Sequence, residues 1–356
     1  MRVHVIGGGV IGMMTARELA LAGVEVVLLE RGRLGAEASW AGGGIMSPLY
    51  PWRHPAAVDA MAQLSQRLYP GLVQSLFADT GIDPQWQACG MLMLDVEDLL
   101  AAQSWAQQRQ VELQLFSDRP GTVLMPQTAH IRNPRLLAAL AADLQRRGVL
   151  IEQGAEVVAF ELDGQRLKAL RLADGRVLSA QSALVCAGAW AGQLLRPLGW
   201  SLPVYPVQGQ MICYAPAPIS RPEHMIMRAS QYIIPRRDGH LLVGSTLEHR
   251  DFHKVTTLEA RAQLIEAAEQ LWPPLRGYDP VAHWAGLRPG SAQGIPTVAA
   301  SPCQGLWVHA GHFRNGLVLA PASSRLLVDL LLQRPPCLPS ADYAWPASAG
   351  SSPPSS

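Results

Sequence analysis

The chain has 356 residues, of which 49% are hydrophobic and 16% charged, so it can bury a large core. Its 29 basic and 28 acidic residues nearly cancel. No cluster of Lys and Arg with interleaved aromatic residues is present, which argues against a nucleic-acid partner. The five cysteines are widely spaced without a C-x-x-C pair. They predict free thiols in a cytoplasmic protein, with neither a disulfide framework nor a bound metal.

The two ends of the chain are unlike the rest. Three glycines interrupt the apolar N-terminus, so it lacks the continuous apolar stretch of a signal peptide. No later segment reaches the roughly 20 apolar residues of a membrane span. We therefore expect no integral membrane segment. Residues 335–356 are rich in Pro, Ser and Ala and predict a flexible tail.

The first elements follow the order strand, helix, strand. Residues 3–6 form a short apolar run, residues 10–22 have helical spacing, and residues 24–29 form a β-branched run. This order predicts one βαβ unit. A loop of small residues is expected at 36–47, and a long helix at 57–79.

The middle of the chain mixes helices with short strands. A strand is expected at 90–95 and a helix at 96–110, and Asn133 is expected to cap a helix that ends near Arg147. Asp-Gly dipeptides then join three strand-like runs, which predicts an antiparallel meander at 155–162, 166–172 and 176–178.

In the last third of the chain, a group of antiparallel strands is followed by elements that again suggest an α/β fold. A buried strand at 182–187 is followed by a helical turn at 190–195. Antiparallel strands are then expected at 210–214, 232–237 and 240–244, followed by a helix at 258–271 and a strand at 281–287. Residues 305–310 and 317–332 again suggest a strand and a helix of an α/β fold. The nucleotide fold is therefore expected to be discontinuous, with a sheet inserted in it.

The segment from Gly7 to Gly12 matches the dinucleotide-binding motif G-x-G-x-x-G directly after the first strand. Gly7 allows the tight turn, Gly9 lets a pyrophosphate approach, and Gly12 lets helix and strand pack closely. Glu30, at the end of the second strand, can accept hydrogen bonds from a ribose. A glycine-rich turn without a ligand is the alternative.

The motif, the small-residue loop after Glu30, the Asp-Gly meander and Ala187-Gly188 together resemble the FAD domain of the glutathione reductase type. Residues 39–45, 284–290 and 311–316 resemble the glycine oxidase branch of the D-amino-acid oxidase family of FAD-dependent oxidoreductases. Together these resemblances cover nearly the whole chain.

The resemblance implies an α/β fold with an inserted α+β domain. Residues 1–80, 130–205 and 290–334 would form a glutathione-reductase-type FAD-binding domain. Residues 81–129 and 206–289 would form an antiparallel-sheet substrate domain. FAD is expected to be bound non-covalently, because attachment as in sarcosine oxidases needs a cysteine near the flavin and residues 288–297 contain none.

The residues expected to bind FAD come from the glycine motif, the loop after the second strand, the meander, the Ala-Gly strand end and the last loop before the C-terminal helix. They are Gly7, Gly8, Gly9, Val10, Ile11, Gly12, Glu30, Arg31, Ser39, Ala41, Gly42, Gly43, Ile45, Val157, Ala187, Gly188, Trp190, His312, Phe313, Arg314, Asn315, Gly316 and Leu317. In the family, the last loop delivers backbone N–H groups to the flavin, where charge accumulates near N1 and the C2 oxygen. An ordinary helix cap by Asn315 is the alternative.

Three residues are expected to bind substrate. Arg288 matches an arginine that holds the substrate carboxylate through two parallel donors, and Tyr232 matches a tyrosine that assists it. Arg314 matches an arginine near the substrate entrance. The alternatives are a core tyrosine for Tyr232 and a surface salt bridge for Arg314. Ser230 and Leu247 stand where some members carry a histidine and a methionine.

The resemblance implies oxidative deamination of a small amino acid, with hydride leaving to the flavin and no catalytic base, so that His312 would be structural or would flank the flavin. The expected reaction converts glycine, dioxygen and water to glyoxylate, ammonia and hydrogen peroxide, serving thiazole formation in thiamine biosynthesis. Alternatives are a sarcosine or D-amino-acid oxidase and a quinone-linked D-amino-acid dehydrogenase. A tRNA-modifying or non-enzymatic flavoprotein is disfavoured, since no basic face is present. Relatives suggest a homo-oligomer such as a tetramer.

Overall fold

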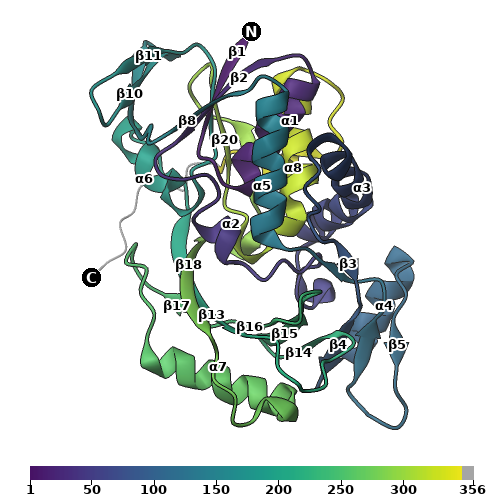
Figure 1. The fold of residues 1–356 in the computed structure, drawn as a ribbon. Coiled ribbons are helices and arrows are strands. Elements are labelled where there is room, and N and C mark those ends of the chain that lie inside the picture. Colours follow the sequence, from purple (N-terminus) through teal and green to yellow (C-terminus); the bar gives the residue numbers. More distant parts are fainter. Residues whose placement is uncertain (347–356) are drawn as a thin grey trace, which may run out of the picture.

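The computed structural model describes residues 1–346, in which two large sheets lie one above the other in the view of Figure 1. The first sheet has six strands in the order β19-β20-β12-β1-β2-β8. Their bounds are β1 Arg2–Ile6, β2 Glu25–Glu30, β8 Leu150–Gln153, β12 Ala183–Val185, β19 Thr297–Ala300 and β20 Leu306–Ala310. All neighbours are parallel except β19 and β20.

Both faces of the central strands β1, β2 and β12 are buried, which explains why these strands are largely apolar. Val3 and Val5 of β1 pack into a core with four helices, whereas Ile6 packs into a core on the opposite face. The helices are α1 Val10–Leu21, α3 Ala56–Thr80, α5 Asn133–Arg146 and α8 Gly316–Leu331. The opposite face is covered by α6 Ala191–Leu195 and by a three-stranded sheet of β9 Val157–Asp163, β10 Arg166–Leu172 and β11 Val177–Ser179. The expected meander and βαβ unit are confirmed.

The second sheet has nine strands in the order β17-β13-β16-β15-β14-β4-β6-β5, with β18 paired to β13. The bounds are β4 Met91–Leu94, β5 Gln114–Leu115, β6 Val123–Met125, β13 Tyr205–Tyr214, β14 Met225–Arg228, β15 Gln231–Pro235, β16 Leu241–Gly244, β17 Glu248–His249 and β18 Ala282–Gly290. The sheet was expected to be antiparallel, but β14 and β4 are parallel. This pair joins the two chain segments that contribute strands to the sheet.

The two faces of the second sheet have different partners. Ile233 of β15 and Val243 of β16 pack against Leu264 of α7 Leu258–Leu271. Tyr232 and Ile234 belong to a separate core on the opposite face. In Figure 1, α7 lies on the side of the sheet remote from α1 and α8. Residues that alternate along β15 therefore face either α7 or the first sheet.

The remaining elements are short or peripheral. They are α2 Ala38–Ala41, α4 Leu99–Arg109, the pair β3 Gln87–Ala88 and β7 Ala129–His130, and the 3-10 helices Pro51–Arg53, Gly188–Trp190, Arg196–Leu198, Pro273–Leu275, Ala292–Gly294, Phe313–Asn315 and Ser340–Tyr343. Within residues 1–346, no helix is both long and apolar enough to cross a membrane.

Two local expectations differ from the structure. Helix α2 lies inside the segment expected to be a loop, and Asn133 does not cap α5 with its side chain. The Asn133 amide instead donates to the carbonyl oxygens of Ser39 at 2.8 Å and Gly42 at 2.9 Å. Its role is to hold the segment that follows β2.

The first part of the expected tail is packed. Tyr343 is 1% exposed, and its hydroxyl donates to the carbonyl oxygen of Ala57 at 2.7 Å. The ring of Trp345 lies 5.8 Å from that of Trp200, measured between centroids. Two aromatic residues thus anchor a segment whose Pro and Ser content alone suggested flexibility. Residues 347–356 of the expected tail lie outside the described part of the chain.

Candidate active site

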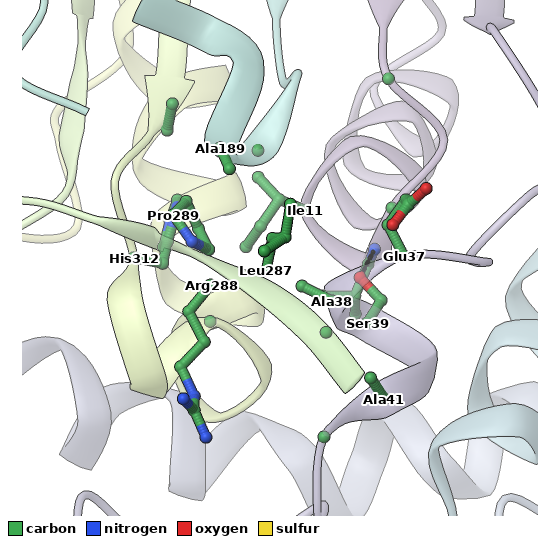
Figure 2. Close-up of a pocket in the computed structure, with 18 of the residues that line it drawn as sticks. Ile11, Glu37, Ala38, Ser39, Ala41, Ala189, Leu287, Arg288, Pro289 and His312 are labelled. Atoms are coloured by element: carbon green, nitrogen blue, oxygen red, sulfur yellow. Dashed lines mark hydrogen bonds between the residues drawn. The ribbon is translucent and has the colours of Figure 1, made fainter. Parts of the chain in front are cut away.

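A cavity of about 430 Å³ lies where β1, β2, β12 and β20 end. Ligands of open α/β sheets bind outside the carboxyl ends of the strands, so this is the expected place for a dinucleotide. The second sheet contributes residues of β13, β15 and β18 to the same cavity. Figure 2 shows Arg288 extending from β18, with Ala38 and Ser39 of α2 on the other side of that strand.

The cavity collects nearly all residues that the sequence suggested as site residues. Every residue expected to bind cofactor or substrate lines it except Gly8 and Gly12. The Gly8 N–H donates to Glu30 Oε2 at 2.7 Å. A Cβ atom on Gly12 would lie 1.9 Å from the carbonyl oxygen of Gly7. Both glycines therefore contribute to the shape of the turn through contacts within the protein and do not line the cavity.

The turn between β1 and α1 depends on glycine. Gly7 has a φ of +108°, and a Cβ there would lie 2.4 Å from the carbonyl oxygen of Cys186. Helix α1 begins after Gly9 without a side-chain cap. Ser39 Oγ accepts from the Val10 N–H at 2.9 Å. The positive end of α1 thus faces the cavity, which suits a pyrophosphate.

Glu30 lies at the end of β2 with both carboxylate oxygens held by backbone. Oε2 accepts from Gly8 and Oε1 accepts from the Gly32 N–H at 2.8 Å. Each oxygen keeps further acceptor capacity, so Glu30 can also accept from ribose hydroxyls. Beside it, the Arg31 guanidinium lies 3.8 Å from the ring centroid of Trp190, which fixes one wall of the cavity.

Helix α8 presents a second helix N-terminus to the cavity. Asn315 occupies its N-cap position, but its side chain makes no capping hydrogen bond. Its Nδ2 is buried without a partner in residues 1–346. The alternative interpretation, in which the Asn315 side chain caps α8, is therefore wrong. Gly316 and Leu317 line the cavity here, and their position suits an acceptor-rich ring system.

These features together test whether the residues fit FAD. A glycine turn offers space where a Cβ would collide, two helix N-termini offer positive potential, and Glu30 offers an acceptor. The buried amide of Asn315 lacks a partner within the described chain, as a donor waiting for a ligand would. The donor set matches a pyrophosphate, a ribose and a flavin ring, so the residues fit this cofactor.

His309 and His312 are buried beside the start of α8. His309 Nδ1 lies 3.0 Å from Thr15 Oγ1, and His312 Nε2 lies 3.2 Å from Ser323 Oγ. Burial lowers the pKa of both, that of His312 to about 3. Both are neutral at physiological pH, so neither supplies a charged acid. A structural or flanking role for His312, as expected, is compatible with this.

Arg288 is held by uncharged groups only. Its Nη1 donates to the carbonyl oxygens of Gln208 and Thr246, both at 3.1 Å, and its Nη2 donates to Ser245 Oγ at 2.9 Å. Within residues 1–346, the Arg288 side chain makes no other hydrogen bond. Burial lowers the pKa of Arg288 to about 10. A partly buried guanidinium without a carboxylate partner is suited to an anionic ligand.

Tyr232 and Arg314 line the cavity together with Arg288. Tyr232 is 7% exposed, and the nearest partner of its hydroxyl is Met211 Sδ at 4.0 Å. Arg314 forms no ion pair within residues 1–346, which contradicts a surface salt bridge, and burial lowers its pKa. Ser230 and Leu247 do not line the cavity, and Leu247 is 43% exposed.

Several lining residues were not expected from the sequence. Gly209, Met211 and Ser245 reach the cavity only because β13 pairs with β18 and β16, which no local pattern indicates. Glu37 also lines the cavity and pairs with Arg31 at 3.7 Å. Glu37 directly precedes α2, so its place at the cavity could have been suspected only once that helix was known.

Comparison with known proteins agrees with this geometry. The family model described as FAD dependent oxidoreductase matches residues 2–330. Glycine oxidases of Pseudomonas aeruginosa and Pseudomonas putida are 48% and 46% identical, each alignment covering 96% of this chain and 98% of the relative. The crystal structure of glycine oxidase from Geobacillus kaustophilus, 27% identical, has a TM-score of 0.90 and covers 98% of this chain and 100% of that chain.

The family model thus spans both sheets and all the residues that line the cavity. The chain therefore belongs to the FAD-dependent oxidoreductases of the D-amino-acid oxidase type and is an enzyme with FAD as its cofactor.

Proposed function

We propose that the protein oxidises glycine with dioxygen and water to glyoxylate, ammonia and hydrogen peroxide. The observation that carries the proposal is Arg288, a partly buried arginine in the cofactor cavity whose protein partners are all uncharged. Such a group favours a ligand that brings a carboxylate. The two Pseudomonas relatives named glycine oxidase support the same substrate.

The hydrogen bonds of Arg288 leave one edge of its guanidinium for this ligand. The group has five N–H donors, and three are used by Gln208, Thr246 and Ser245. One N–H of Nη2 and the N–H of Nε remain. A guanidinium can use such a pair of N–H groups to bind the two oxygens of a carboxylate. We assign them to the substrate, with the Tyr232 hydroxyl as a third donor.

When bound, FAD would supply the acceptor for a hydride from the substrate α-carbon and the route of the electrons to dioxygen. The described residues contribute binding and orientation. Arg288 and Tyr232 fix the carboxylate, and the neutral rings of His309 and His312 leave the proton chemistry to the amine and water. Fixing the carboxylate restricts where the α-carbon of the substrate can lie relative to the bound cofactor.

Glycine is the proposed substrate, and its nearest competitors are sarcosine and D-alanine. A pocket distinguishes one methylene by only about 1–3 kcal/mol, so a single lining side chain can shift the preference. Tyr232, Met211 and Leu49 line the cavity together with Arg288 and would limit the size of the substrate.

We further propose that residues 1–80, 130–205 and 290–334 bind FAD and that residues 81–129 and 206–289 carry the substrate pocket. The strands of the six-stranded sheet all fall in the first set, which supports this division. A role in thiazole formation for thiamine is supported by the bifunctional protein ThiO/ThiG of Synechocystis, 31% identical over 93% of this chain and 52% of that protein. We also propose that the protein is cytoplasmic and forms a homo-oligomer such as a tetramer.

The test is peroxide release by purified, FAD-loaded protein with glycine, sarcosine, D-alanine, D-proline and L-alanine. The proposal predicts peroxide with glycine at the highest kcat/KM and none with L-alanine. Oxidation of glycine only in the presence of a quinone would make the protein a dehydrogenase. No reaction of bound flavin with any of the five compounds would exclude an amino-acid oxidase.

A further inference from the structure

Side chains on one face of β15, together with that of Arg236 just beyond its end, contact Gly43. A Cβ atom on Gly43 would lie 2.8 Å from Ile234 Cδ1 and 3.1 Å from the Tyr232 ring. Arg236 Nη2 donates to the carbonyl oxygen of Gly43 at 2.7 Å. Residues 232, 234 and 236 alternate along an extended segment and so face the same side. Gly43 therefore lies against three side chains of one strand face.

Arg236 is held in this position without a carboxylate. It is 5% exposed, and its Nη1 donates to the Ile131 carbonyl oxygen and to His130 Nδ1, each at 2.8 Å. Burial and the Arg236 charge lower the pKa of His130 to about 3, which keeps this ring neutral and able to accept. The guanidinium thus joins β7 and the segment after α2 to the end of β15.

The segment around Gly43 is held from its other side as well. Asn133 Nδ2 donates to Ser39 and Gly42, and the Ile131 N–H donates to the carbonyl oxygen of Gly44 at 2.9 Å. Gly43 itself lines the cavity, whereas Arg236 does not. The only side chain that bonds the Gly43 carbonyl in residues 1–346 is Arg236. Its loss would free this peptide to move against Tyr232.

We propose that Arg236 is a positioning residue for substrate binding, acting through Gly43 on Tyr232. By holding the Gly43 carbonyl, Arg236 fixes the surface against which the Tyr232 ring packs. The ring in turn fixes the hydroxyl at the cavity that Arg288 also lines, where the substrate carboxylate is proposed to bind. This inference rests on the proposed function, since it takes the ligand at Tyr232 to be a carboxylate.

The test compares Arg236→Lys and Arg236→Met with wild type. Arg237→Met is the matched control, because Arg237 is the next residue and bonds Asp83 and the Trp86 carbonyl instead of Gly43. Glycolate, a carboxylate without an amine, is titrated into FAD-loaded protein and followed by the flavin absorbance. Losing the buried hydrogen bonds should raise the glycolate Kd and the glycine KM about tenfold in Arg236→Met. For Arg236→Lys, both constants should lie between those of wild type and Arg236→Met. For Arg237→Met, both should stay within about twofold of wild type.

A double-mutant cycle separates positioning from general destabilisation. Tyr232→Phe is made in wild type and in both Arg236 variants, and the glycolate Kd is measured at a temperature where all bind FAD. If Arg236 acts through Tyr232, the penalty of Tyr232→Phe should shrink in the Arg236 backgrounds. Additive penalties, or an unchanged Kd with only a lowered Tm, would overturn the inference. Should Arg236→Met fail to retain FAD, the same criteria apply to Arg236→Lys.

The outcome in wild type distinguishes the two proposals. If wild type and the Arg236 variants bind glycolate equally well, the role of Arg236 is contradicted and the proposed function is not. FAD-loaded wild type that shows no response to glycolate contradicts the proposed function and this inference with it.

Discussion

The guanidinium of Arg288 lies directly over Gly209: a Cβ atom on Gly209 would lie 2.1 Å from both Nη1 and Nη2. The two residues stand on paired strands, because β13 and β18 run antiparallel with Val207 opposite Arg288. The absence of a side chain at position 209 is therefore what allows Arg288 to lie across β13 and to reach the Gln208 carbonyl oxygen.

Gly209→Ala should displace Arg288 while leaving the cofactor bound. The new methyl group cannot coexist with the guanidinium, so the bonds to Gln208 and Thr246 must be lost or distorted. We expect the glycine KM to rise about tenfold or more with near-normal FAD content. Gly71→Ala in α3 is the control, since a Cβ there meets nothing within 4 Å. Equal kinetics for Gly209→Ala and wild type would show that Arg288 does not need this position.

Glu30→Ala should weaken FAD binding more than it alters the reaction. It removes the acceptor proposed for the ribose and leaves the N–H groups of Gly8 and Gly32 without their carboxylate. The FAD Kd should rise about tenfold, and kcat should recover with excess FAD. Glu25→Ala at the exposed start of β2 serves as control, because within residues 1–346 Glu25 pairs only with Arg2. A Glu30→Ala protein saturated with flavin yet inactive would contradict the ribose assignment.

The flavin should be released by acid precipitation. Cys186 is a cavity-lining cysteine, and burial raises its pKa to about 12, so its thiol is a poor nucleophile. The yellow colour should appear in the supernatant, and Cys186→Ser should bind flavin as wild type does. Flavin that stays with the precipitated protein would mean covalent attachment.

The stability of the protein should fall as the pH drops below about 6.5. His312 titrates near 6.5 in the unfolded chain, whereas burial lowers its pKa in the folded protein to about 3. Between these values the unfolded state binds the extra proton, so acid favours unfolding by about 1.4 kcal/mol per pH unit for such a group. Unfolding by urea at pH 7.5, 6.0 and 5.0 measures this slope. His312→Gln should make the slope shallower, and an identical slope would mean that His312 is already protonated.

The parts of the fold governed by local sequence could be predicted. The glycine turn, Glu30 and the first helix lie within one βαβ unit, where spacing alone determines which residues meet. Helix α7 begins at Leu258 after Thr257, whose side chain accepts from the Ala260 N–H as an N-cap should. Such features depend on neighbours in the chain and leave a recognisable pattern.

The parts of the site governed by distant pairing could not be predicted. Gly209 and Ser245 meet Arg288 only through the register of β13, β16 and β18. Asn133 looked like a helix cap because it precedes Pro134, but its amide serves the Ser39–Gly42 backbone. Arg236 gave no local indication of its contact with Gly43, since the two are brought together only when the sheets meet.

Steady-state oxidation of glycine by FAD-loaded Arg288→Ala tests the central claim most directly, with Arg288→Lys beside it and glycolate binding as a second readout. The alanine variant should keep its flavin spectrum, lose glycolate binding, and show a steep rise in KM with a lower kcat, because the α-carbon is no longer held in place. Lysine should restore activity only in part, since it supplies charge without the planar pair of donors. Near-normal glycine oxidation by Arg288→Ala would contradict the account and move the carboxylate site to another group, with Arg314 the next residue to replace.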